Sequence, residues 1–190
     1  MRSLACFLFI TWVGGAASAG PVPAAAATEK GGGPLTIGRP APAFKLRKLD
    51  GSLVRLDALA YSGKEKPWAK RRVVLLDFFR TDCGPCREGL PKLSSLHKKY
   101  VNRGLEVILV ALLEPEEGRD KLTRYLADVK PEFTIVVDDA EHWSKKFLGD
   151  RVQIPALFLV DKTGNVAFKT TGLSDTATLT VAIDRALGSS

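Results

Sequence analysis

The stretch Val73–Leu93, VVLLDFFRTDCGPCREGLPKL, places two cysteines three positions apart directly after an apolar run. Residues 73–79 are short, apolar and partly β-branched, which is typical of a strand buried on both faces. From residue 85 to about residue 100, apolar side chains recur at helical spacing, at Leu90, Leu93, Leu96 and Tyr100. The stretch therefore predicts a buried strand, a tight connection and a helix, with the cysteines at the start of the helix.

Cys83 and Cys86 are expected to form a redox pair. Residues three apart at a helix start lie on the same side, so their sulfurs can bond. Pro85 suits the first turn, where its missing N–H costs nothing. The unpaired N–H groups and the positive dipole end of the helix stabilise a thiolate at Cys83. Cys83 would attack a substrate disulfide, and Cys86 would resolve the mixed disulfide.

The cysteine pair has two other possible roles. A structural staple is disfavoured because a bridge between neighbours three apart closes almost no loop and restrains the unfolded chain little. Zinc normally takes four protein ligands, or three and a water, and besides the pair the mature chain, without its N-terminal signal, offers only His97 and His142. No metal site and no cofactor are expected. A copper- or zinc-carrying chaperone that uses the pair and a histidine remains the alternative function.

The N-terminus resembles a secretory signal. MRSLACFLFITWVGGAASAG has one positive charge, an apolar run and an Ala-Ser-Ala cleavage site. We expect residues 1–19 to be a signal peptide, residues 20–36 a flexible linker and residues 37–190 one domain. Cys6 would be removed with the signal. The protein is then exported to the periplasm or another extracytoplasmic space, or stays anchored to the membrane through an uncleaved N-terminal segment.

Composition is that of a globular protein, with 45% hydrophobic and 26% charged residues. The net charge of +7 raises the question of nucleic acid. The basic residues are scattered, however, and no aromatic side chains interleave with them, so we expect no nucleic-acid partner.

The rest of the chain predicts strands, helices and turns in an α/β order. A hairpin is expected to turn at Asp50–Gly51 and a second one at residues 162–165, and Ser174 or Asp175 should cap a final helix that reaches Leu187. Between the hairpins lie two strand patterns and two helical patterns, at residues 105–113, 118–129, 133–138 and 140–148. This order favours a central sheet covered by helices.

The quoted stretch, followed by VQIPALFLVDKTGNV, resembles thioredoxin-fold proteins, and the hairpin and extra helix resemble the exported TlpA/ResA-like branch of thiol–disulfide oxidoreductases. The resemblance covers Ile37 to Leu187. It implies a mixed β-sheet flanked by helices, with an N-terminal β-hairpin extension. It also implies that the protein reduces disulfide-containing protein substrates and is recharged by a membrane thiol-transfer reductant. A peroxiredoxin shares the fold but needs Pro-x-x-x-Thr-x-x-Cys, and LLDFFRTDC lacks that proline.

The resemblance also assigns roles to residues. Cys83 takes the place of the exposed nucleophile and Cys86 that of the buried resolving thiol. Ile154–Pro155 takes the place of the cis-proline, whose preceding backbone pairs with an extended substrate segment. Asp77 matches the buried acid that helps to deprotonate the second cysteine. Glu114 matches, more weakly, an acid that tunes the disulfide.

Asp82 departs from the family, which usually has Trp directly before the first cysteine. An acid there is expected at the site entrance, where it favours basic substrates. It also opposes the effect of the helix dipole on the thiolate of Cys83. Arg80, two residues earlier, is expected to neutralise this carboxylate in part.

Overall fold

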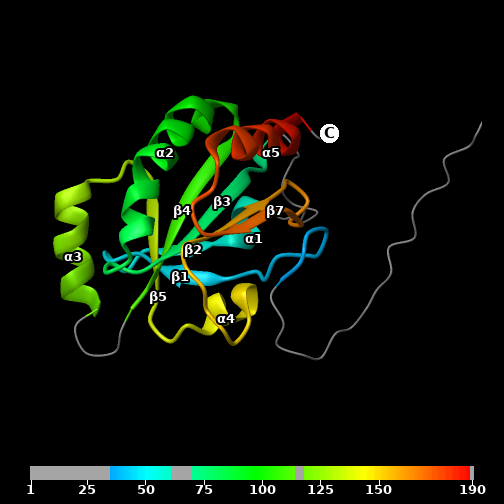
Figure 1. Cartoon of the computed structure of the whole chain (residues 1–190). Coiled ribbons are helices and arrows are strands. Elements are labelled where there is room, and N and C mark those ends of the chain that lie inside the picture. Colours follow the sequence, from blue (N-terminus) through cyan, green and yellow to red (C-terminus); the bar gives the residue numbers. More distant parts are fainter. Residues whose placement is uncertain (1–34, 61–69, 114–117, 189–190) are drawn as a thin grey trace, which may run out of the picture. The chain divides into compact units, whose positions relative to one another are not determined.

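The computed structural model describes residues 35–60, 70–113 and 118–188. The strands are β1 (Lys45–Arg47), β2 (Leu53–Arg55), β3 (Val73–Phe79), β4 (Leu105–Leu112), β5 (Thr134–Asp138), β6 (Ala156–Val160) and β7 (Val166–Thr171). The helices are α1 (Leu56–Leu59), α2 (Gly84–Tyr100), the short 3₁₀ turn η2 (Val101–Arg103), α3 (Gly118–Val129), α4 (His142–Leu148) and α5 (Thr176–Gly188). The predicted α/β order is confirmed (Figure 1).

The strands form one mixed sheet in the order β2-β1-β5-β4-β3-β6-β7. Strands β3, β4 and β5 are parallel, whereas β1 and β6 run antiparallel to their neighbours β5 and β3. All seven residues of β3 are buried, as its uninterrupted apolar run predicts for a strand covered on both faces. The predicted hairpin, β1 and β2, joins the sheet through β5 and extends its edge.

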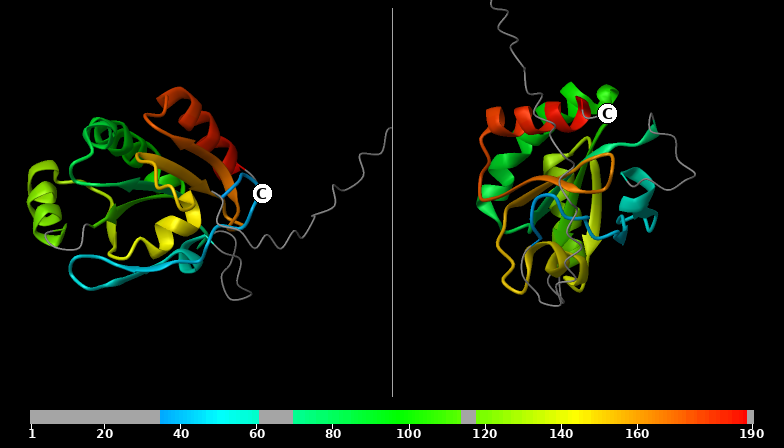
Figure 2. Two further views of the ribbon diagram at one scale, coloured as in Figure 1. Left: turned by 60° about the horizontal axis from the view of Figure 1, so that its bottom comes forward. Right: turned by 90° about the vertical axis from the view of Figure 1, so that its right-hand side faces the viewer.

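Helices cover both faces of the sheet (Figure 2). Side chains alternate along β3: Val73, Leu75 and Phe79 pack against α2, α3 and α5, whereas Val74, Leu76 and Phe78 pack against α1 and α4. Asp77 stands between Leu75 and Phe79 in the first series, so its side chain lies on the α2 side of the sheet. The sheet thus places a carboxyl in the core beneath the helix that carries the cysteine pair.

Helix α2 begins and ends where the sequence indicates. Cys83 is its N-cap, and Pro85 lies in its first turn. The helix is one element through Pro91, whose carbonyl accepts a hydrogen bond from the Ser95 hydroxyl at 3.0 Å. After η2, Gly104 takes the left-handed conformation at φ 103°, which glycine adopts without the Cβ penalty. The chain then enters β4.

Asp138 fixes the start of α4. Its buried carboxylate accepts hydrogen bonds from the backbone N–H groups of Trp143 and Ser144, at 3.1 and 2.7 Å. Further along α4, Phe147 packs against Phe78 and Phe158, with ring centroids 5.2 and 5.3 Å apart. The helix is therefore held at both ends, and so is the start of the segment that leads to Ile154.

At the C-terminus, Asp175 rather than Ser174 caps α5. Its carboxylate accepts a hydrogen bond from the backbone N–H of Thr178 at 3.0 Å, which satisfies one of the unpaired donors of the first turn. The helix ends at Gly188.

The predicted signal peptide and most of the predicted linker lie outside the described residues. At the beginning of the described chain, the backbone N–H of Leu35 donates to the Phe147 carbonyl at 2.9 Å, and its side chain packs against the core. Contacts with the domain are therefore already present at Leu35, two residues before Ile37, the predicted boundary. Within the described residues, no helix combines the length and apolar character needed to cross a membrane.

Candidate active site

Cys83 and Cys86 form a disulfide, with their Cα atoms 5.2 Å apart. The backbone N–H of Cys86 donates to the Cys83 sulfur at 3.2 Å, so an unpaired donor at the helix start points at that sulfur. Cys83 is partly exposed, whereas Cys86 is only 2% exposed. An external thiol or disulfide can therefore reach the first sulfur but not the second.

The Ile154–Pro155 peptide bond is cis, as the resemblance implied. The Pro155 carbonyl accepts a hydrogen bond from the backbone N–H of Gly172 at 2.8 Å, which ties the proline to the end of β7. Pro155, Cys86 and Asp77 all line one small cavity of about 30 Å³. Three of the predicted site residues are thus brought together around the buried sulfur.

Asp77 is 3% exposed, and its Oδ1 atom has no hydrogen-bond partner among the described residues. Burial raises the pKa of Asp77 to about 8, because an ionised carboxylate is poorly solvated in an apolar core. At neutral pH the group is therefore mostly the neutral acid in this disulfide form. Asp77 and Cys86 both line the same small cavity, which has room for one water molecule that could carry a proton between them.

Tyr125 of α3 lies close enough to Asp77 to feel its charge, and it contacts Phe79 and Arg87. Its ring lies 5.7 Å from that of Phe79, and the guanidinium of Arg87 lies 5.1 Å above it. Burial raises the pKa of the Tyr125 hydroxyl; the Arg87 guanidinium opposes this rise, and the nearby Asp77 adds to it to a smaller extent. The helical pattern of residues 118–129 indicated that Tyr125 faces the core, but nothing in the pattern indicated its contact with the site.

One sequence expectation is wrong. Arg80 does not neutralise Asp82; its guanidinium pairs with the Glu141 carboxylate at 2.5 Å. Glu141 takes a left-handed conformation at φ 49° just before α4, and its carboxylate meets both Arg80 and, at 3.7 Å, Lys145. Asp82 is exposed beside Cys83, and no ion pair is recorded for it within the described chain.

The described residues hold no group of three or more His, Cys, Asp or Glu side chains arranged to bind a metal ion. The two histidines make edge-to-face contacts with neighbouring rings, His97 with Phe133 and His142 with Trp143. His97 lies eleven residues beyond Cys86 on α2, roughly 16 Å along the axis at about 1.5 Å per residue. These positions give no support to a metal-carrying role for the pair. Glu114, the weaker tuning candidate, lies outside the described residues.

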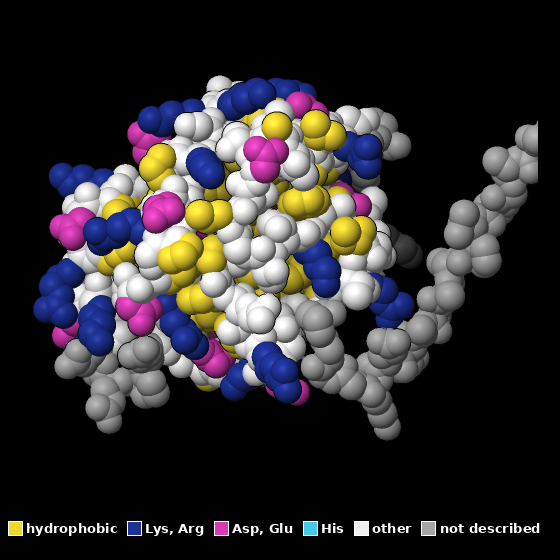
Figure 3. Space-filling model, in the orientation of Figure 1, with side chains coloured by type: hydrophobic (Ala, Val, Ile, Leu, Met, Phe, Trp, Pro, Cys, Tyr) yellow, Lys and Arg dark blue, Asp and Glu magenta, His cyan; other side chains and the backbone are white. Residues whose placement is uncertain are grey.

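Charge is dispersed over the face shown in Figure 3. Hydrophobic side chains gather toward the middle of this face, and Lys and Arg side chains lie mostly around its rim, interspersed with Asp and Glu. The net charge of +7 is therefore not concentrated in one basic patch on this side.

A disulfide at the start of a helix, directly after a buried central strand and beside a cis-proline, defines a thioredoxin-fold dithiol protein. Comparison with known proteins agrees with this class. Residues 37–169 match the model of the AhpC/TSA family, and the chain belongs to this family.

Similar proteins are named as thiol-disulfide oxidoreductases or thiol:disulfide interchange proteins. The thiol-disulfide oxidoreductase ResA of Geobacillus thermodenitrificans is 30% identical over 139 residues, 73% of this chain and 71% of the relative. A ResA of Bacillus cereus is 28% identical over 140 residues, 73% of this chain and 71% of the relative. A crystal structure assigned as the thiol:disulfide interchange protein DsbE from Chlorobium tepidum superposes with a TM-score of 0.67 at 30% identity, covering 81% of this chain and 99% of that one. The chain is thus a thiol–disulfide oxidoreductase of the ResA and DsbE type.

Replacing Asp77 by Asn should stabilise the oxidised protein in a pH-dependent way. Below pH 4 the carboxyl is neutral in the folded and unfolded states, so the two proteins should be equally stable. Between pH 4 and 8 the unfolded chain loses this proton while the folded chain keeps it, so the wild type loses stability relative to Asp77→Asn. The gain should level off above pH 8 at roughly 3–6 kcal/mol, the equivalent of raising a carboxyl pKa from near 4 to near 8.

Urea unfolding of both oxidised proteins at pH 4, 6, 8 and 9 measures this difference. A constant difference across the series would show that Asp77 titrates normally in the folded protein.

Proposed function

We propose that this protein is an exported reductant that transfers two electrons from the Cys83–Cys86 dithiol to disulfides of extracytoplasmic proteins. The observation that carries the proposal is the asymmetry of the pair: a partly exposed sulfur at the helix N-cap is bonded to a buried sulfur that shares a cavity with Asp77 and Pro155. A purely structural disulfide does not require a buried carboxyl group beside one of its sulfurs. A two-step exchange needs both an accessible nucleophile and a protected resolving thiol.

The first step uses Cys83. In the reduced protein its thiolate, stabilised by the N–H groups of the first turn of α2, attacks one sulfur of the substrate disulfide. A new S–S bond forms between Cys83 and the substrate, the substrate S–S bond breaks, and the other substrate sulfur leaves as a thiolate that takes a proton from water.

The second step uses Cys86 and Asp77. The Cys86 thiol gives its proton to Asp77 in its ionised form and attacks the Cys83 sulfur, which restores the protein disulfide. The mixed disulfide breaks, and the second substrate sulfur leaves as a thiolate that takes a proton from water. The substrate has then gained two electrons and two protons. Asp77 is left as the neutral acid, which is the form that its raised pKa favours in the disulfide state.

Recharging runs through the same groups in reverse. A partner thiolate attacks Cys83 and forms a mixed disulfide with it, and Asp77 returns its proton to Cys86 as that sulfur leaves. A second thiolate of the partner then attacks the partner sulfur of the mixed disulfide, which oxidises the partner and releases Cys83 as a thiolate. Because the proposed compartment is oxidising, the dithiol must be recharged by a reductant, and the family resemblance implies a thiol-transfer protein in the membrane. The proposal of export rests on the apolar run and small-residue cleavage site of residues 1–19.

Substrate binding is proposed at Ile154 and Asp82. No backbone hydrogen bond is recorded for Ile154 among the described residues, so its N–H and C=O groups are free to pair with an extended segment beside Cys83. Asp82, exposed and not paired with Arg80, contributes a negative charge at the entrance. This charge favours basic side chains near the substrate cysteine.

The roles of the two cysteines can be separated by trapping. In Cys86→Ser the first step proceeds and the second cannot, so mixed disulfides with substrate should accumulate through Cys83. Cys83→Ser should neither reduce insulin nor form adducts, because Cys86 is buried. Insulin turbidity and mass spectrometry of adducts measure both outcomes, and consumption of hydrogen peroxide serves as a control for peroxidase activity. Adducts on Cys86 in the Cys83→Ser protein would reverse the assignment.

Asp77→Asn should slow the second step at least tenfold at pH 7 and leave the first step nearly unchanged, because an amide cannot accept the proton of Cys86. The defect should shrink as the pH rises and Cys86 ionises without help. Rapid-quench measurements of the mixed disulfide between pH 6 and 9 follow both steps. Equal rates for the two proteins at every pH would leave Asp77 with a structural role only.

A further inference from the structure

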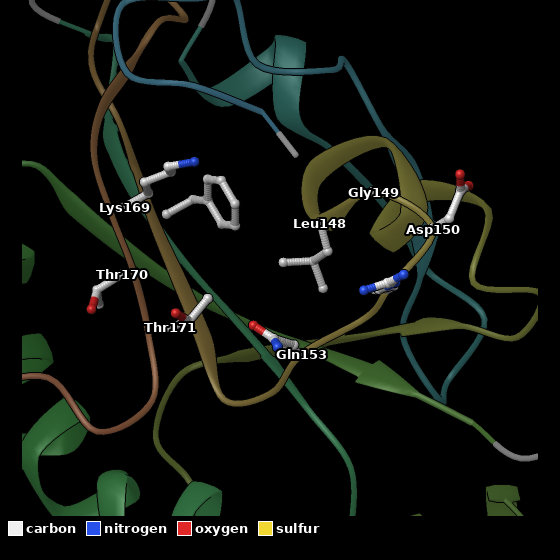
Figure 4. Close-up of a pocket in the computed structure, with 9 residues that line it drawn as sticks. Leu148, Gly149, Asp150, Gln153, Lys169, Thr170 and Thr171 are labelled. Carbon is white, nitrogen blue, oxygen red and sulfur yellow. The ribbon is translucent and has the colours of Figure 1, made fainter. Parts of the chain in front are cut away.

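A pocket of about 780 Å³ lies between the segment that follows α4 and the outer strand β7. We call it the Lys169 pocket; its lining comprises Leu148, Gly149, Asp150, Arg151, Gln153, Phe158, Lys169, Thr170 and Thr171. Figure 4 shows the side chains of Leu148, Gln153 and Thr171 pointing into the same space. The pocket is far larger than the cavity at Asp77 and lies on the opposite face of the sheet, since Leu148 and Phe158 belong to the α4 side.

The Lys169 pocket adjoins the cis-proline. Gln153 precedes Pro155 by two residues, and Thr171 pairs in the sheet with Ala156, the residue directly after Pro155. The backbone N–H of Gly172, next to Thr171, donates to the Pro155 carbonyl. One end of the pocket is therefore formed by residues on both sides of the segment where substrate pairing is proposed.

The beginning of the described chain borders the pocket without filling it. Leu35 lies beside α4, where its backbone N–H donates to the Phe147 carbonyl. From there the chain runs to β7, where Gly38 and Arg39 form backbone hydrogen bonds with Val166, at 2.8 and 2.9 Å. Lys169 donates from its ammonium group to the Leu35 carbonyl at 2.8 Å, which holds the charged end of this side chain at the margin of the pocket. Among the described residues, no strand pairs with β7 beyond Val166 on its outer side.

The lining combines an apolar floor with positive charge. Leu148 and Phe158 are 7% and 3% exposed. Lys169 is partly buried and Arg151 exposed, and no ion pair is recorded for either cation within the described chain. The single carboxylate, Asp150, points away from Lys169 and Gln153 in Figure 4. The pocket therefore offers two cations and side-chain donors to a ligand that also has apolar atoms.

We propose that the Lys169 pocket binds an acidic side chain of the extended substrate segment that contacts Ile154 and Pro155. This inference rests on the proposed function and adds a substrate class to it. A segment of peptide suits the pocket better than a small anion, because the lining extends to the residues beside the cis-proline and includes a hydrophobic floor. A substrate thus carries a basic residue near Asp82 and an acidic residue further along, which fixes its direction across the site.

The test measures non-covalent binding to the oxidised protein, so it does not depend on turnover. The probes are neutral ten-residue peptides with Ser in place of the substrate Cys and one Glu placed two to five residues before or after it; Gln replaces Glu in the matched set. NMR titration with ¹⁵N-labelled protein should show at least one Glu position that binds three- to tenfold more tightly than its Gln counterpart. The shifted amides should include Lys169 and Thr171, and the preference should weaken at high salt.

Lys169→Gln and Arg151→Gln should each remove most of that preference. Arg151 is exposed, so its replacement does not disturb folding. The matched control is Lys98→Gln, a cation 65% exposed near the far end of α2, which should keep the full preference. Equal binding of Glu and Gln peptides at every position, or loss of the preference in Lys98→Gln as well, would overturn the proposal.

Reduction of 2-hydroxyethyl disulfide, measured separately, tests the proposed function. If the protein binds the Glu peptide but does not reduce this disulfide, the pocket proposal stands and the proposed function is wrong.

Discussion

The complete burial of β3 is the constraint on which the site depends. All seven of its residues are covered, by α2, α3 and α5 on one face and by α1 and α4 on the other. The strand also lies between β4 and β6, so its position is fixed in every direction. The chain leaves β3 at Phe79 and starts a helix at Gly84, which leaves only a short turn to place Cys83. The same sheet brings Pro155 to the cysteines, because β6 runs antiparallel to β3 and therefore begins where β3 ends.

Asp77 is the one polar interruption of that strand, and it weakens the fold at neutral pH. A carboxyl that must stay protonated until about pH 8 costs the folded state free energy at every pH above its ordinary pKa. An apolar residue at the same place would remove that cost. The cost is understandable if the proton itself is used, since Asp77 borders the same cavity as the sulfur that must lose and regain a proton in each cycle. Cys83 needs no such partner, because the N–H groups at the start of α2 stabilise its thiolate and solvent can take up its proton.

Local signals account for what could be predicted from the sequence. Three predictions depend on residues close together in the chain, and the structure confirms them: the buried strand β3, the place of Pro85 in the first turn of α2, and the buried face of α2. The cis bond before Pro155 followed from resemblance alone. The ion pair of Arg80 with Glu141 was missed because it joins residues 61 positions apart. Its glutamate also has a left-handed backbone, which few non-glycine residues adopt. The Lys169 pocket was missed for a similar reason: its cations stand on two separate segments and meet only through the pairing of β6 with β7.

The central claim is that Cys83 and Cys86 are a working redox couple on the reducing side. Equilibration of the purified protein with dithiothreitol or glutathione buffers, followed by alkylation and mass spectrometry, measures its potential directly. We expect one two-electron transition with a potential closer to that of thioredoxin, about −270 mV, than to that of the strong oxidant DsbA, about −120 mV. A potential near −120 mV would make the protein an oxidant, and a pair that stays oxidised in excess dithiothreitol would be a structural bridge; either result would contradict the account.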